Sequence, residues 1–134
     1  LLSSGPMRGH VDLPPILEES EDVERVNKLM PLKRRCLIQV LHTTRGLDSA
    51  LALLLQVRRI AVPSNYRSLG GYLKLLGAGH GGRLTIREVK LYQRTIVKRR
   101  NVYMHKAGSA PAGVGEVNTL LNDMQACLVR VLAT

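Results

Sequence analysis

The chain has 134 residues, which is enough for one domain with a single core and too few for two ordinary ones. It contains no Phe or Trp and only 4 Tyr, and this scarcity of aromatic residues argues against a β-sandwich or a β-barrel. Its 20 basic residues outnumber its 10 acidic ones, and the formal net charge of +10 favours a polyanionic, phosphate-rich partner.

The N-terminal part of the chain divides into two short segments. Residues 1–6, which read LLSSGP before Met7, have the look of a cleaved tag remnant. Residues 7–31 form an acidic segment, in which the run of acids that follows Pro14 and Pro15 is expected to open a helix and to complement its positive dipole. We expect a helical domain over residues 32–134.

The first long element of this domain is a helix. Apolar residues recur at helical spacing from Leu32 to about Arg59, which predicts one long helix or two nearly collinear ones. His42 lies on this helix among apolar neighbours, and in such a setting a histidine of the core or of an interface is more common than a catalytic one.

A short helix and a glycine-rich connector come next. After a turn around Pro63, Ser64 or Asn65 is expected to cap a short helix that ends at about Leu76. Residues 77–82 are rich in glycine, but no Lys-Ser/Thr follows and no strand precedes them, so the phosphate-loop and dinucleotide-binding signatures both fail. We expect a connector here.

The second half of the chain predicts two more helices. Thr85 and Glu88 have the spacing of a capping box, which predicts a helix from Ile86 to about His105. Residues 107–113 break it, and apolar residues at helical spacing from Val117 to Leu132 mark a final amphipathic helix. The sum is an all-α fold, an antiparallel four-helix-type bundle with an extra short helix.

The positive charge gathers in the middle of the chain. Residues 1–32 carry 3 basic and 6 acidic side chains, residues 33–106 carry 16 and 2, and residues 107–134 carry 1 and 2. A basic middle with acidic flanks is the distribution expected of a face that meets a phosphate backbone. The alternative is a solvated basic surface.

Several other classes of protein are disfavoured. Cys36 and Cys127 cannot supply a disulfide framework, and no cluster of Cys and His accompanies them, so we expect neither a zinc site nor another cofactor. The longest strongly apolar stretch, Leu47–Val57, is about half of what a bilayer span requires. We therefore expect a cytoplasmic protein without membrane contact.

The most specific motif lies at the end of the basic helix and reads Arg100-Asn101-Val102-Tyr103-Met104-His105. Cleavage of RNA without a metal needs a group that takes a proton from the 2′-hydroxyl or gives one to the leaving 5′-oxygen, and histidine does both near neutral pH. It also needs a fixed cation on the phosphorane, which a guanidinium provides. The motif holds both residue types.

The spacing of the motif decides which side chains share a helix face. Asn101 and His105, at i and i+4, share one face, whereas Arg100 and His105 lie about 140° apart around a regular helix. The two therefore act together best if the helix unwinds near His105, or if two copies of the motif meet across a dimer axis.

This motif, at the end of a helix in a small all-helical domain, resembles that of the HEPN superfamily (higher eukaryotes and prokaryotes nucleotide-binding domains). Members that carry it are metal-independent endoribonucleases of toxin–antitoxin, phage-defence and CRISPR effector systems, and they pair so that both motifs line one cleft. The resemblance covers the helix order of residues 32–133, and its specific part is residues 100–105. Many toxin members continue the motif with His-Gly-Tyr, whereas this chain continues with Lys106-Ala107-Gly108.

The resemblance implies a metal-independent endoribonuclease that cleaves RNA by attack of the 2′-hydroxyl, in a prokaryotic toxin or defence effector. His105 is then the general acid or base, Arg100 stabilises the phosphorane, and Asn101 orients His105 or the phosphate. The expected RNA-binding residues are Lys98, Arg99, Lys106 and Arg94. A homodimer with a composite active site is also implied, with a protein antitoxin or a larger defence complex as partner.

Two other classes of function remain open at this point. The first is a non-catalytic RNA- or nucleotide-binding helical module that keeps the motif in order to bind phosphate. The second is a helical scaffold within a larger assembly, which leaves the basic middle of the chain without a purpose.

Overall fold

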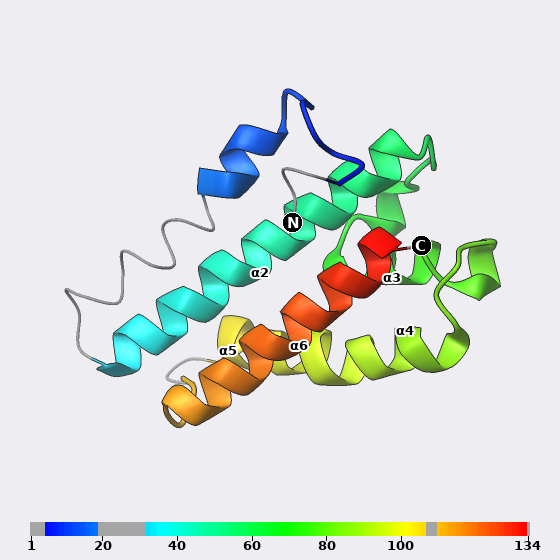
Figure 1. Ribbon diagram of the computed structural model, residues 1–134. Helices are drawn as coiled ribbons and strands as arrows, with labels where there is room; N and C mark the ends of the chain where they lie inside the picture. The colour runs from blue at the N-terminus through cyan, green and yellow to red at the C-terminus, as the bar shows by residue number, and fades with distance from the viewer. Residues whose placement is uncertain (1–4, 19–31, 107–109, 134) are drawn as a thin grey trace.

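The computed structural model describes residues 5–18, 32–106 and 110–133, and over these ranges the protein is all-α (Figure 1). The predicted fold class is therefore confirmed, and an isolated bridge between Gly77 and Leu84 is the β-type pairing found there. Residues 13–18 are helical. The further helices are α2 (Leu32–Val57), α3 (Leu69–Leu75), α4 (Ile86–Tyr92), α5 (Lys98–His105) and α6 (Val114–Ala133), with a π-helical turn at Gln93–Val97 and 3₁₀ turns at Ser64–Tyr66 and Ala78–His80.

The long helix α2 lies at the centre of the molecule and contacts α3, α5 and α6. Figure 1 shows α2 and α6 running in the same direction, with α4 and α5 running the opposite way. Three long segments therefore make up most of the fold, since α3 has only 7 residues, and the expected four-helix bundle is not confirmed. The single long helix expected from Leu32 onwards is present and ends at Val57.

The core is built from the apolar faces that predicted the helices. Leu51, Leu54 and Leu55 of α2 are fully buried against residues of α3, α6 and the π-helical turn. Cys36 and Cys127 belong to the same core as free thiols, and burial raises the pKa of Cys127 to about 12. Both cysteines therefore serve as small apolar residues.

A second, smaller core forms where the N-terminal segment lies on α2. Met7, Leu13 and Ile16 are buried there together with Ala50 and Leu53 of α2. The N-terminal helix begins at Leu13, so the two prolines that follow lie in its first turn, where the missing N–H groups cost nothing. Residues 1–4 of the expected tag remnant and most of the acidic run lie outside the described residues.

The short helix α3 is capped by a residue other than those expected. Ser68 is its N-cap, and the Ser68 hydroxyl accepts a hydrogen bond from the Gly71 amide at 3.1 Å. Ser64 and Asn65 instead lie in a 3₁₀ turn, closed by a 2.9 Å hydrogen bond from the Tyr66 amide to the Pro63 carbonyl. The prediction of a cap at Ser64 or Asn65 is therefore wrong, because the backbone closes its own turn there before the helix begins.

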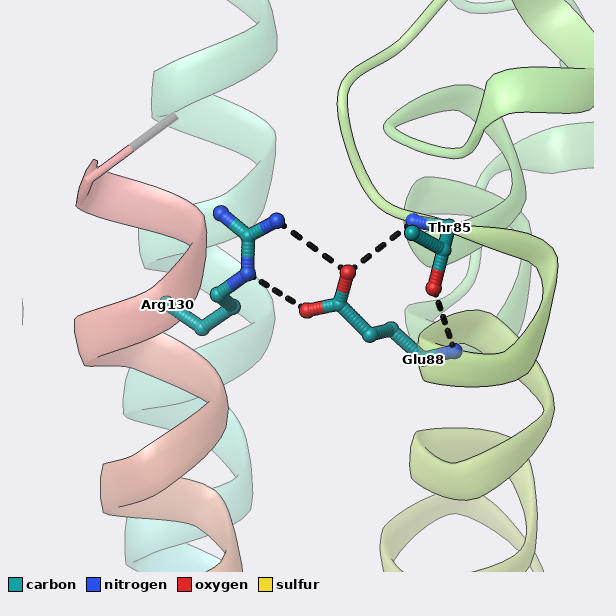
Figure 2. A network of polar contacts seen from close by, with 3 residues as sticks. All are labelled: Thr85, Glu88 and Arg130. Atoms are coloured by element: carbon teal, nitrogen blue, oxygen red, sulfur yellow. Dashed lines mark hydrogen bonds and ion pairs between the residues drawn. The ribbon is translucent and has the colours of Figure 1, made fainter.

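The predicted capping box at the start of α4 is confirmed and has a second role. The Thr85 hydroxyl accepts from the Glu88 amide, and the Thr85 amide donates to Glu88, both at 3.1 Å. Arg130 of α6 binds the same carboxylate, with Nε 2.5 Å from Oε2 and Nη2 3.1 Å from Oε1 (Figure 2). These contacts lower the pKa of Glu88, and the hydrogen bond from Arg130 has the largest effect. Glu88 thus caps α4 and ties it to α6.

The helix expected from Ile86 to His105 is interrupted by the π-helical turn. The Gln93 side chain donates to the Gly70 carbonyl at 2.8 Å, so that this turn is anchored to α3. Thr95 donates to the Leu91 carbonyl at 2.9 Å, a second side-chain bond in the same stretch. Neither Gly nor Pro marks the site in the sequence, so the expectation of one regular helix is wrong at this turn.

Replacing Glu88 with Gln should lower the free energy of unfolding at neutral pH, because the ion pair with Arg130 is lost while the amide can still cap α4. Since folding lowers the pKa of Glu88, its carboxylate stabilises the fold fully above its ordinary pKa of 4.5, and this contribution is lost as pH falls through the folded pKa. Denaturant titrations of the two proteins should differ at pH 7 and converge in acid. A difference that persists in acid would contradict this account.

Candidate functional site

A groove of about 780 Å³ lies between α2, α5 and the turn that precedes α3. Its charged and titratable lining residues come from all three elements. Its apolar part comes from Ile38 and Leu41 of α2 and Met104 of α5. The charged and titratable lining residues are His42, Arg45, Asp48, Arg67, Arg100 and Tyr103.

The groove exists because α2 carries a polar face beside its core face. The residues of α2 that line the groove fall within a sector of one side of the helix, and they are Ile38, Leu41, His42, Thr44, Arg45 and Asp48. Arg100 and Met104 of α5, at i and i+4, supply the facing wall. Two regular helix faces therefore form this part of the surface.

Arg100 carries a buried nitrogen that lacks a hydrogen-bond partner within the described part of the chain. Its side chain is partly buried, and its Nε is buried without a hydrogen-bond partner among the described residues. Burial raises the pKa of Asp48, and the positive charge of Arg100 opposes that rise. A buried guanidinium N–H without a partner costs free energy. The Arg100 side chain also lines the groove, where a guanidinium can meet an anion.

Contacts with α6 hold α5 from its other side. The Tyr103 hydroxyl donates to Glu116, which also accepts from the Ala112 amide at 2.6 Å. Arg99 forms an ion pair with Asp123 of α6 at 3.6 Å. Burial, followed by the contact with Glu116, raises the pKa of Tyr103 to about 12, so the hydroxyl stays protonated as a donor. These contacts fix the rotation of α5 that turns Arg100 towards α2.

The other two residues of the predicted catalytic set lie outside the groove. His105 is exposed as the last residue of α5, and Asn101 is partly buried, but neither is among the residues that line the groove. The helix stays regular up to His105, and the backbone leaves it only at Lys106, with φ −105° and ψ 110°. Unwinding near His105 is therefore not observed, and one chain does not bring Arg100 and His105 to one groove.

The four predicted RNA-binding residues fall into two groups. Lys98, Arg94 and Lys106 are exposed. Arg99 is partly buried and engaged with Asp123. The first three therefore present charge to solvent around the end of the helix, whereas Arg99 serves in part to hold α5 on α6.

One face of α2 carries groove residues that the sequence analysis did not assign to a site. His42 was expected in the core or at an interface, but it is partly buried and lines the groove with Arg100. Arg45, Asp48 and Arg67 were not singled out. The spacing of His42, Arg45 and Asp48 along the helix is the signal that places them on a common face, separate from that of the core leucines.

Comparisons with known proteins identify no relative. No family model matches the chain, and neither a curated protein nor a solved structure matches it. Among the described residues, no group of three His, Cys, Asp or Glu could hold a metal ion. In the same ranges, no helix has the length and apolarity needed to cross a bilayer.

Two glycines near the groove make a matched pair for a stability test. A Cβ at Gly71 would lie 2.2 Å from the Tyr66 carbonyl oxygen, in the turn that carries Arg67, so Gly71→Ala should destabilise the fold by about 1–3 kcal/mol. A Cβ at Gly46, within α2, meets nothing within 4 Å, so Gly46→Ala should stabilise it by about 0.5–1 kcal/mol. Chemical denaturation measures both. Equal effects of the two changes would contradict the close approach at Gly71.

Proposed function

We propose that this protein is a metal-independent endoribonuclease that cleaves RNA by attack of the 2′-hydroxyl, in the manner of the HEPN domains that its motif resembles. Its biological setting is then a prokaryotic toxin or defence effector, with a protein antitoxin or a larger defence complex as partner. The proposal is supported by chemistry at the groove, by the distribution of charge and by the motif at residues 100–105.

The observation that carries the proposal is that three arginine side chains, Arg45, Arg67 and Arg100, line one groove. A guanidinium presents its donors in a planar fork that matches the oxygens of a phosphate. The apolar lining beside it lowers the local dielectric and strengthens that attraction. Residues 33–106, with 16 basic and 2 acidic side chains, supply the wider field for a polyanion.

The proposed reaction is an in-line displacement within the RNA. The 2′-oxygen loses its proton to a general base and forms a bond to phosphorus, while the bond from phosphorus to the 5′-oxygen breaks. The 5′-oxygen takes a proton from a general acid, which leaves a 2′,3′-cyclic phosphate and a 5′-hydroxyl. Arg100 stabilises the charge that develops on the phosphorane, and His105 serves as general acid or base.

A second copy of the chain completes the site in this proposal. Arg100 and His105 lie about 140° apart on a regular helix, so one chain cannot aim both at the same phosphate. In a two-fold dimer, His105 of a second copy can enter the groove that Arg100 lines, with Asn101 one turn earlier on the same helix face. The site would then be composite.

A non-catalytic RNA- or nucleotide-binding module is the second candidate function. The same groove and the same arginines favour it, because phosphate binding needs the cations and not the histidine. The two candidates differ in what a change at His105 does. The enzyme loses turnover and keeps its affinity, whereas the binding module has no turnover to lose.

His105→Ala and Arg100→Ala should each lower cleavage by about two to four orders of magnitude, the usual size for the loss of a general acid or base or of a contact to the transition-state charge. The double variant should lose less than the product of the two losses, because both residues serve one step. Single-turnover assays on labelled RNA measure this. Products should carry 2′,3′-cyclic phosphate, and EDTA should leave the rate unchanged. Cleavage that requires added Mg²⁺ would contradict the mechanism.

Mixing the two inactive variants tests the composite site. In a mixed dimer of Arg100→Ala and His105→Ala chains, one of the two sites retains both residues, so random exchange should restore about one quarter of wild-type activity. If both residues act within one chain, mixing restores nothing. Sedimentation of each variant at the assay concentration confirms that dimers are present in both experiments.

Binding to RNA should weaken steeply as salt is added. If several phosphates are neutralised by the basic residues, the logarithm of affinity should fall linearly with the logarithm of salt concentration, with a slope of several units. Arg67→Gln should make the slope shallower by about one unit. Fluorescence anisotropy with a non-cleavable 2′-deoxy analogue measures both, and a flat salt dependence would rule out electrostatic binding.

A further inference from the structure

His42 lines the groove, whereas His105, the histidine of the motif, does not. His42 lines the groove together with Arg100, on the face of α2 that also carries Arg45 and Asp48. His105, in contrast, is exposed at the end of α5 and outside the lining. Within one chain, His42 is therefore the imidazole that lines the same groove as the partly buried side chain of Arg100.

The surroundings of His42 distinguish it from a histidine of the core. The core residues of α2, such as Val40 and Leu51, are fully buried, whereas His42 is partly buried and has access to the groove. The charged and titratable groups that line the groove with it are Arg45 and Asp48 of α2, Arg67 before α3, and Arg100 and Tyr103 of α5. An imidazole among phosphate-binding cations, at the edge of an apolar floor, is suitably placed for proton transfer at a bound phosphodiester.

We infer that His42 is a second catalytic histidine, which accepts the proton of the RNA 2′-hydroxyl while Arg100 holds the phosphate. This inference rests on the proposed function. The 2′-oxygen, once deprotonated, bonds to phosphorus, and the bond to the 5′-oxygen breaks. The departing oxygen receives its proton from the imidazolium of His105 of a second copy. Exchange of protons with water then returns both imidazoles to their starting states.

This division of roles fits the placement of His42 and His105 on different helices. A base and an acid must act on opposite sides of the phosphorus in an in-line displacement, so they cannot occupy one position. His42 is fixed in the middle of a 26-residue helix, and His105 stands at the end of an 8-residue one, where a second copy can reach it. The base, His42, lies in the groove, and the acid, His105, comes from the second copy of the chain.

The test compares His42→Gln with the wild-type chain in single-turnover cleavage of RNA. His42→Gln should lower the rate by about two to four orders of magnitude, while affinity for the 2′-deoxy analogue stays nearly unchanged. The variant should also lose the acidic limb of the pH–rate profile, because that limb reports deprotonation of the base. His105→Ala should lose the alkaline limb instead. A matched control is His80→Gln, since His80 is exposed, makes an edge-to-face contact with Tyr66 and lies outside the groove, so its rate should equal that of the wild type.

The outcomes separate this inference from the function on which it rests. If the wild type cleaves and His42→Gln cleaves equally well, His42 is not catalytic, and the endoribonuclease proposal stands. If the wild type cleaves nothing, the proposed function fails and the role of His42 fails with it. If circular dichroism shows that His42→Gln is misfolded, the NMR signals of the His42 imidazole in the wild-type protein provide the test. These signals should shift when the 2′-deoxy analogue binds. Signals that do not shift would overturn the inference.

Discussion

The burial of α2 on two sides is the constraint on which the rest of the structure depends. One face carries Leu51, Leu54 and Leu55 into the main core, and a second carries Ala50 and Leu53 against the N-terminal segment. The third face is left for the groove. Burying each large apolar side chain contributes about 1.5–3 kcal/mol to the stability of the fold, so packing at the first two faces holds the helix in place. The third face is held in place by that packing and contributes little to it. Polar and titratable residues can therefore be placed there at little cost to the fold.

The wall that faces α2 depends on polar contacts more than on apolar ones. The helix α5 has no fully buried residue, and its rotation is set by Tyr103 against Glu116 and by Arg99 against Asp123. A hydrogen bond to a charged acceptor is stronger than an ion pair whose atoms lie 3.6 Å apart, so the contact at Tyr103 is the firmer of the two. The groove thus has one wall fixed by hydrophobic packing and another fixed by hydrogen bonds to α6.

The features that could be predicted from the sequence depend on residues that lie close together in the chain. The apolar spacing from Leu32 onwards and the capping box at Thr85 depend on residues within one or two turns of one another, and both features are present in the structure. The cap at Ser68 was missed because Ser64, Asn65 and Ser68 can all cap a helix, and the backbone hydrogen bond from Tyr66 to Pro63 places the first two in a separate turn. The place of His42 was missed because the facing wall lies 58 positions further along the chain, at Arg100.

The π-helical turn at Gln93–Val97 sets the phase of everything that follows it in the chain. A π turn holds one residue more than the α-helix would, and one residue corresponds to about 100° of rotation in a regular helix. Counted from α4, the phase of Arg100 is therefore displaced by that amount, and the displacement is held by the bond from Gln93 to the Gly70 carbonyl. The side of α5 that faces α2 is therefore set by the length of the chain between α4 and Arg100 as well as by the residue types.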